Sequence, residues 1–227
     1  MTQKIALLRT KPKDRRDVWN AGLLDGCRFD GKYEMPMLPK CSIVPDKLTA
    51  FSDAKIDKAD GSFIHTFQDD YKFERLRRRP RRYLRLLLSY GGAIAPDFSV
   101  YRAMPLSLQI NSVFRSRALG YWWAKNGVTV VPNVRWGDER SYEFCFDGLP
   151  QGSVVAVGTH GCIKRIRDRN YFLEGFFVML ERIRPTTVIV YGAASDDIFL
   201  PLFVAGYGVE IVVFPSKFSC SHAKEAV

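Results

Sequence analysis

Six short apolar segments recur along the chain, and each one ends at polar residues or at a glycine. They are three to six residues long, which suits strands better than helices. Several are rich in valine without alternating polar positions, a pattern typical of strands that are buried on both faces of a parallel sheet. The predicted strands cover residues 63–67, 93–95, 128–131, 154–157, 187–191 and 209–214.

Helical patterns separate most of these segments. Between Met104 and Asn126, apolar residues recur at steps of three and four, which predicts one buried helical stripe. Pro105 suits the first helical position, and Gly127 suits the left-handed residue that closes a helix. Other helices are expected to begin near Asp69 or Asp70 and to cover residues 80–89, 167–184 and 196–206.

Strands that alternate with helices predict an α/β fold with a largely parallel sheet of about six strands joined by crossover helices. The helical connections between parallel strands are expected to be right-handed. The sheet is either doubly wound or a partial (β/α) barrel, and the pattern leaves both open. In either case ligands bind at the carboxyl ends of the strands.

The first part of the chain lacks this regular pattern. Residues 1–60 are interpreted as an N-terminal extension and a segment that wraps the domain, with a short strand at residues 42–44. Glycines and prolines are frequent there and break any long element. A single α/β domain is expected over residues 61–227.

Eight polar or aromatic side chains fall at or just after the predicted strand ends. Asp69, Asp97, Asp138 and His160 have the chemistry to bind a divalent metal or to act as general acid and base. The other four are candidate ligand contacts, and the two aromatic ones suit stacking on a base or a sugar. These candidates are Asn133, Trp136, Thr159 and Tyr191.

Each of these residues also has a plain structural alternative. Asp69 can cap the following helix, and Asp97 can form a turn with its own backbone. Their coincidence at one sheet edge predicts a pocket there more strongly than it predicts catalysis.

Charge adds a second candidate function. The chain of 227 residues has a net charge of +10 and a pI near 9.5, which favours polyanions such as nucleic acid as partners. The basic residues concentrate in one predicted helical region, where arginine can bind phosphate with two parallel hydrogen bonds. A solvated helical face is the alternative. The region contains Lys72, Arg75, Arg77, Arg78, Arg79, Arg81, Arg82 and Arg85.

Other features narrow the setting. Five scattered cysteines form no close-spaced framework, which favours a reduced, cytoplasmic protein. No apolar segment approaches the roughly 20 residues of a membrane span, so no membrane partner is expected. Phosphate-binding glycine signatures and the nucleophile elbow of α/β-hydrolases are absent from the sequence.

The chain between Phe67 and Gly192 resembles a family called domain of unknown function 4417, found in bacteria, archaea and phages. The resemblance implies a phage or mobile-element setting and brings no activity with it. It covers a little over half of the chain. The similar stretches are Asp69–Glu74, Pro96–Tyr101, Met104–Pro105, Gln109–Asn111, Gly127–Trp136, Glu143–Phe144, Phe146–Gly148 and Val190–Gly192.

Three functional hypotheses follow. The leading one is a protein associated with nucleic acid, with hydrolase activity at the strand ends. The second is a binding protein without enzymatic activity, which engages a host protein or a nucleotide. The third is a glycosidase-like enzyme that uses two of the carboxylates, with Trp136 as a platform for the sugar.

Overall fold

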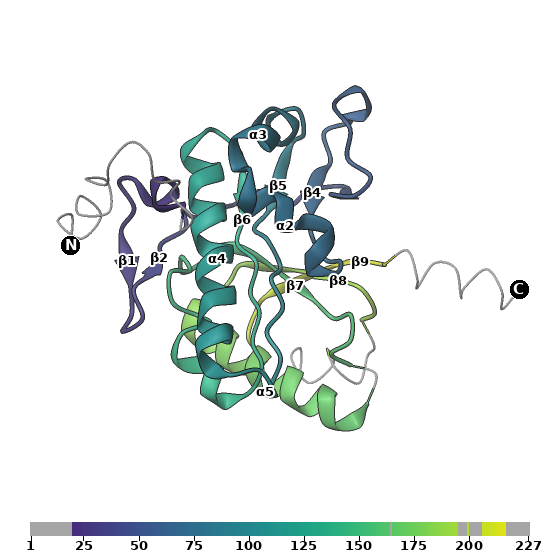
Figure 1. The fold of residues 1–227 in the computed structure, drawn as a ribbon. Helices are drawn as coiled ribbons and strands as arrows, with labels where there is room; N and C mark the ends of the chain where they lie inside the picture. Colours follow the sequence, from purple (N-terminus) through teal and green to yellow (C-terminus); the bar gives the residue numbers. More distant parts are fainter. Residues whose placement is uncertain (1–19, 164, 195–198, 200–205, 217–227) are drawn as a thin grey trace, which may run out of the picture.

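Two parallel sheets form the centre of the protein (Figure 1). The computed structural model describes residues 20–163, 165–194, 199 and 206–216. In each sheet the strands follow one another in chain order. The first sheet contains β3 (Leu48–Ala50), β4 (Phe63–His65), β5 (Gly92–Ile94) and β6 (Val130–Val131), and the second contains β7 (Val154–Gly158), β8 (Thr187–Tyr191) and β9 (Glu210–Phe214).

All six predicted strands are present, and every pairing among them is parallel. The α/β class is therefore confirmed, but sheets of four and three strands replace the expected single sheet of about six. Neither sheet reverses its strand order, as a doubly wound sheet does at its switch point. The pairings of the described residues leave β3 and β9 as edges, so they do not close a barrel.

The strand predicted at residues 42–44 is wrong. These residues form no strand, and Ser42 and Ile43 are exposed, Ile43 by 49%, so this segment is not a buried element. The strand of this region is β3 instead, which pairs in parallel with β4. Its sequence, Leu-Thr-Ala, carries no apolar run that would have identified it.

A short backbone seam joins the two sheets. Asn133, two residues beyond β6, forms an isolated parallel bridge with Ala156 of β7. Ala156 N donates to Pro132 O, and Val134 N donates to Ala156 O, both at 2.8 Å. All seven strands therefore run in one direction across the seam, with their carboxyl ends at one edge.

The inner faces of both sheets share one apolar cluster. Each strand from β3 to β9 contributes at least one side chain to this cluster. On β7, Val154 and Ala156 both do so, because side chains two positions apart on a strand point to the same face. This shared cluster packs the inner faces of the two sheets together. Its members on the strands are Leu48, Phe63, Ile94, Val131, Val154, Ala156, Ile189 and Phe214.

Four helices cover the outer faces of the sheets (Figure 1). They are α2 (Asp70–Arg78), α3 (Pro80–Leu88), α4 (Leu106–Lys125) and α5 (Ile166–Ile183), close to the bounds expected from the sequence. Pro80 occupies the first turn of α3, where its missing N–H costs nothing. The helix expected at residues 196–206 falls almost wholly outside the described residues.

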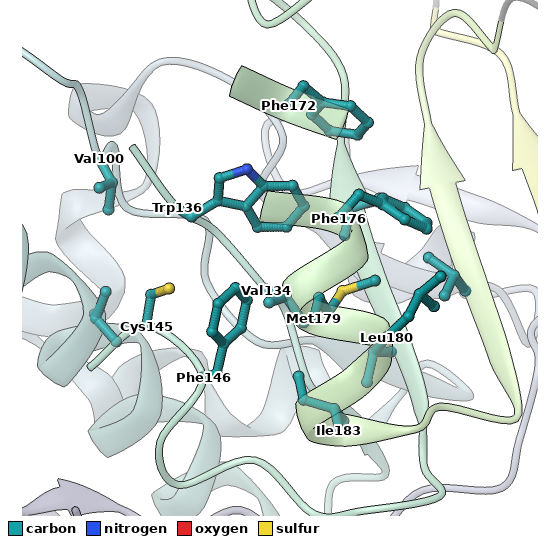
Figure 2. Packing of buried hydrophobic residues seen from close by; sticks show 14 of the residues in the cluster. Val100, Val134, Trp136, Cys145, Phe146, Phe172, Phe176, Met179, Leu180 and Ile183 are labelled. Atoms are coloured by element: carbon teal, nitrogen blue, oxygen red, sulfur yellow. The ribbon is translucent and has the colours of Figure 1, made fainter. Parts of the chain in front are cut away.

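Helix α5 packs against the second sheet and the segment after β6 (Figure 2). Its buried stripe includes Phe172, Phe176 and Met179, at the spacing that the sequence predicted. Trp136 lies against this stripe, with its ring centroid 5.3 Å from that of Phe172. The outer face of the second sheet is therefore covered by aromatic side chains.

The segment before β3 contains short elements only. A 3-10 helix, η1 (Ala21–Leu24), precedes a two-residue antiparallel pair of β1 (Phe29–Asp30) and β2 (Met35–Pro36). Two further 3-10 helices are η2 (Ile56–Lys58) and η3 (Glu139–Glu143). The domain boundary near residue 60 stays a prediction. Within the described ranges, no helix is long and apolar enough to cross a membrane.

One buried arginine ties α4 to the seam. The Arg117 guanidinium donates to the backbone carbonyls of Asn133 (2.8 Å), Cys145 (2.8 Å) and Asp147 (3.2 Å). The residue is 1% exposed, and burial lowers its pKa to about 10. The charged guanidinium therefore supplies hydrogen bonds to three backbone carbonyls that accept none from a neighbouring strand.

We predict that Arg117→Met lowers the free energy of unfolding by about 2–5 kcal/mol, because three buried carbonyls lose a charged donor. Lys125→Met is the control on the same helix. Its ion pair with Asp25 is exposed to solvent, so the change costs at most about 1 kcal/mol. Urea denaturation of both variants measures the difference, and equal losses would contradict this role of Arg117.

Candidate functional site

A cleft of about 1060 Å³ opens at the carboxyl ends of the strands. Residues at or just beyond the end of every strand line it, although they are distant in sequence. The expected convergence of the strand ends is therefore observed. One such residue for each strand, from β3 to β9, is Ser52, Phe67, Asp97, Arg135, His160, Tyr191 and Ser216.

Asp97 is the most enclosed carboxyl group of the cleft, with a side chain only 11% exposed. Its Oδ1 accepts a hydrogen bond from Asn133 Nδ2 at 2.9 Å, and its Oδ2 lies 3.8 Å from Arg135 Nη1. Burial raises the pKa of Asp97, while Arg135 and Asn133 oppose this shift without cancelling it. The group is therefore easier to protonate than an ordinary aspartate.

Two contacts from the preceding strand and helix hold the loop that carries Asp97. The Asp97 backbone N–H donates to Thr66 Oγ1 at 2.8 Å. The Asp70 carboxylate, in the first turn of α2, accepts hydrogen bonds from the backbone N–H and the hydroxyl of Ser99. Asp70 thus fixes the position of the loop.

An aromatic wall stands beside Asp97. Phe67 and Tyr191 stack with ring centroids 5.1 Å apart and an interplanar angle of 12°, and His65 lies 4.3 Å from Tyr191. His65 and Tyr191 end β4 and β8, and Phe67 lies two residues beyond β4, so the rings come from both sides of the seam. Gly158 makes room for the wall, because a Cβ there would lie 2.8 Å from Phe67 Cδ1.

Charged pairs surround the mouth of the cleft. Asp69 pairs with Lys72 at 2.8 Å, and its hydrogen bond to Lys72 lowers the pKa of Asp69, with a smaller effect from His160. On the α5 side, Arg102 pairs with Asp168 and lies over the ring of Tyr171, 4.2 Å from its centroid. The mouth therefore offers cationic groups next to aromatic surfaces.

The candidate catalytic residues do not all meet in the cleft. Asp69, Asp97 and His160 line it. Asp138 is not among the lining residues, because its carboxylate turns to Arg140, 3.0 Å away. Among the described residues, no three His, Cys, Asp or Glu side chains form a group that could hold a metal ion.

The candidate ligand contacts divide in the same way. Tyr191 lines the cleft, whereas Asn133 and Thr159 lie behind its wall. Thr159 is buried and donates its hydroxyl hydrogen to Ala193 O at 2.9 Å, which ties the end of β7 to the chain beyond β8. Asn133 and Thr159 therefore position lining residues, and the structure gives neither a direct path to a ligand.

Trp136 borders the cleft, but most of its ring belongs to the core. It is 8% exposed and its Nε1 donates to Tyr171 O at 3.3 Å. Gly175 of α5 allows this packing, because a Cβ there would lie 2.2 Å from Trp136 Nε1. An open stacking platform for a sugar, as expected from the sequence, is not available on a ring packed in this way.

Of the eight basic residues between Lys72 and Arg85, only Lys72 lines the cleft. The basic helical region and the strand-end site are thus mostly separate surfaces.

Sequence reasoning missed several lining residues, among them His65, Phe67 and Arg135. In the sequence, His65 and Phe67 belong to a predicted apolar strand, residues 63–67, and carry no other signal of a site. Their position at the end of a strand, on the face that points inward, was the signal that could have identified them.

Comparison with known proteins agrees with the resemblance seen in the sequence. The sequence model of a family described as domain of unknown function (DUF4417) matches residues 27–208. This match begins at residue 27, so it includes more than half of the expected extension and wrapping segment, residues 1–60. No solved structure matches the chain.

Similar proteins occur in mycobacterial phages. The Gene 1 proteins of Mycobacterium phage D29 and Mycobacterium phage L5 are each 34% identical to the chain over 174 residues, which is 74% of its length. The matched region spans 64% of the D29 protein and 76% of the L5 protein. The chain therefore spans less than two thirds of the D29 relative.

We predict that Asp97→Asn changes how stability depends on pH. A raised native pKa makes the folded protein bind more protons than the unfolded chain, so stability falls as pH rises from about 3.9 through the native pKa. Asp97→Asn should lack this part of the fall. Asp138→Asn, which alters a carboxylate outside the cleft, should keep it. Urea denaturation from pH 4 to pH 8 measures both, and parallel curves for wild type and Asp97→Asn would refute the buried-acid description.

Proposed function

Because the chain belongs to the DUF4417 family, whose description names no activity, we propose a function from the cleft itself. The protein is a phage-type, nucleic-acid-associated hydrolase. Its cleft binds a nucleotide-like substrate, and Asp97 transfers the proton. The observation that carries this proposal is a carboxyl group with a raised pKa, only 11% exposed, that opens on a large cleft at converging strand ends.

The surroundings of Asp97 support the role of general base. The Asn133 hydrogen bond fixes one carboxyl oxygen, and the other faces Arg135 across 3.8 Å, a gap longer than a hydrogen bond. In the proposed reaction, Asp97 accepts a proton from water as the hydroxide oxygen bonds to the substrate. The scissile bond then breaks, and Asp97 returns the proton to the leaving group. Water is thus the only co-reactant.

The cleft walls support a substrate that combines an aromatic ring with an anionic group. The stacked Phe67 and Tyr191 offer a flat apolar surface on which a base can pack. Arg102 and Arg135 line the same cleft and carry guanidinium groups suited to phosphate oxygens, which would compete there with their carboxylate neighbours, Asp168 and Asp97. A nucleotide has both parts, whereas a simple sugar has neither.

The same wall also favours a second function, ligand binding without chemistry. Stacking and ion pairing need no proton transfer, so a nucleotide-binding protein would use the same residues. The glycosidase hypothesis has less support, since the only other candidate catalytic carboxylate on the cleft, Asp69, is already paired with Lys72.

We predict that nucleotides stabilise the protein and that it hydrolyses at least one of them. Ribo- and deoxynucleoside mono- and triphosphates, dinucleotides and nitrophenyl glycosides serve as probes. Thermal unfolding detects binding, and chromatography detects products. Asp97→Asn should keep binding and lose turnover by about 10²–10⁴-fold. Tyr191→Ala should weaken binding, because it removes one of the two stacked rings of the aromatic wall.

Asp138→Asn is the control and should behave like wild type, because its carboxylate pairs with Arg140 outside the cleft. Binding without product would support the binding protein instead of the hydrolase. No stabilisation of wild type by any nucleotide would overturn both.

A further inference from the structure

Five exposed arginines lie close together in the chain, at the end of α2, on α3 and at the residue between the two helices. On α3, residues 81, 82 and 85 are spaced so that they share one face of the helix. Two further exposed arginines, residues 78 and 79, directly precede α3 in the chain. We call this the arginine surface, and it consists of Arg78, Arg79, Arg81, Arg82 and Arg85, all exposed.

Most of this charge is not neutralised by neighbours. Glu74 is the acid of the region, and it pairs with Arg77 and Arg115 while Arg78 lies 3.7 Å from it. Within the described residues, the guanidinium groups of the other four members of the arginine surface have no carboxylate partner. Folding therefore leaves a concentrated positive charge facing solvent.

The packing of the helices explains why the arginines face outward. Phe73 and Leu76 of α2 and Leu87 of α3 are fully buried in the core. Because these apolar faces are used inside the protein, they are not available to enter a membrane. Leu88 is the one large hydrophobic residue of α3 that is strongly exposed. On α2, Tyr71 is also exposed, at 77%. Two such side chains, one on each helix, fall short of the continuous apolar face that a lipid-binding helix needs.

The arginine surface lies away from the cleft but is connected to it along α2. Helix α2 begins just after β4, at the cleft edge, where Lys72 lines the cleft. Helix α3 ends just before β5 begins, at the opposite edge of the sheet. Two nine-residue helices cover up to about 27 Å, which matches the rise of roughly eight nucleotides of one DNA strand.

We propose that the arginine surface binds the phosphate backbone of a nucleic acid and leads the strand along α2 toward the cleft. This rests on the proposed function, of which it specifies the polymer partner and the contact surface. Guanidinium groups bind phosphate oxygens in pairs without reading bases, so the surface holds the backbone with little sequence preference.

Binding of the full chain to fluorescein-labelled 20-nucleotide single-stranded DNA and RNA of mixed sequence, and to the matching duplex, tests this proposal. Fluorescence anisotropy is measured from 50 to 300 mM salt. Arg81→Ala, Arg82→Ala and Arg85→Ala together should weaken binding at least about tenfold. They should also reduce the slope of log K against log salt by roughly 2–3.

The matched control removes the same charge elsewhere. Lys32→Ala, Lys40→Ala and Lys58→Ala together alter three exposed lysines outside α2 and α3, and should change affinity less than about threefold. Equal losses in the two triple variants would overturn the proposal, since they would indicate net charge alone. Replacement of the three arginines by lysine should restore part of the affinity, because charge returns without the planar fork.

Two further outcomes are decisive. No oligonucleotide binding at 50 mM salt overturns the proposal. Arginine-dependent binding to phosphatidylserine vesicles, without binding to the oligonucleotides, assigns the surface to a membrane and also overturns it. The proposed hydrolase is tested separately, because nucleotide turnover in the cleft needs Asp97 and not the arginine surface. If the wild-type protein hydrolyses mononucleotides but binds no oligonucleotide, the hydrolase proposal stands and the proposal for the arginine surface is wrong.

Discussion

The seam at Asn133 is the constraint on which the site depends. Its backbone bridges to Ala156 and joins the two parallel sheets, while its side chain donates to Asp97. Its carbonyl in turn accepts from the buried Arg117. The same residue therefore sets the alignment of the sheets and the position of the buried acid. Since parallel strands end at a common edge, this alignment is what brings seven chain-distant segments around one cleft.

Polar groups around the seam are costly to bury, and the structure compensates for many of them with specific contacts, although Asn133 Oδ1 is buried without a hydrogen-bond partner. Arg117 bonds three carbonyls, and Asp70 and Thr66 hold the loop of Asp97. For Asp97, the cost of burying the charge is compensated only in part by Asn133 and the nearby Arg135, and its pKa is therefore raised. Incomplete compensation of a group that faces a cleft is characteristic of functional sites, where the cost in stability is retained for chemistry.

Much of this arrangement could be predicted from the sequence. Short valine-rich segments predict strands that are buried on both faces, as in a parallel sheet. Together with the apolar spacing of three and four residues in the intervening helices, they predict the α/β class. Asp97 and Tyr191 were found for the same reason, since they follow such strands. Pairing was harder to predict. The split into two sheets depends on where the backbone hydrogen bonds between β6 and β7 are interrupted. The roles of Asp138 and Trp136 depend on their side-chain partners, Arg140 and Phe172, which the strand and helix pattern does not reveal.

The protonation of Asp97 tests the central claim most directly. Carbon-13 NMR of aspartate-labelled protein, with Asp97 assigned by loss of its carboxyl signal in Asp97→Asn, gives the titration midpoint. Burial beside the seam predicts a midpoint clearly above the usual value of about 3.9. A midpoint at or below that value would contradict the account, because Asp97 would then be an ordinary ion-paired carboxylate and not a buried acid ready to exchange a proton.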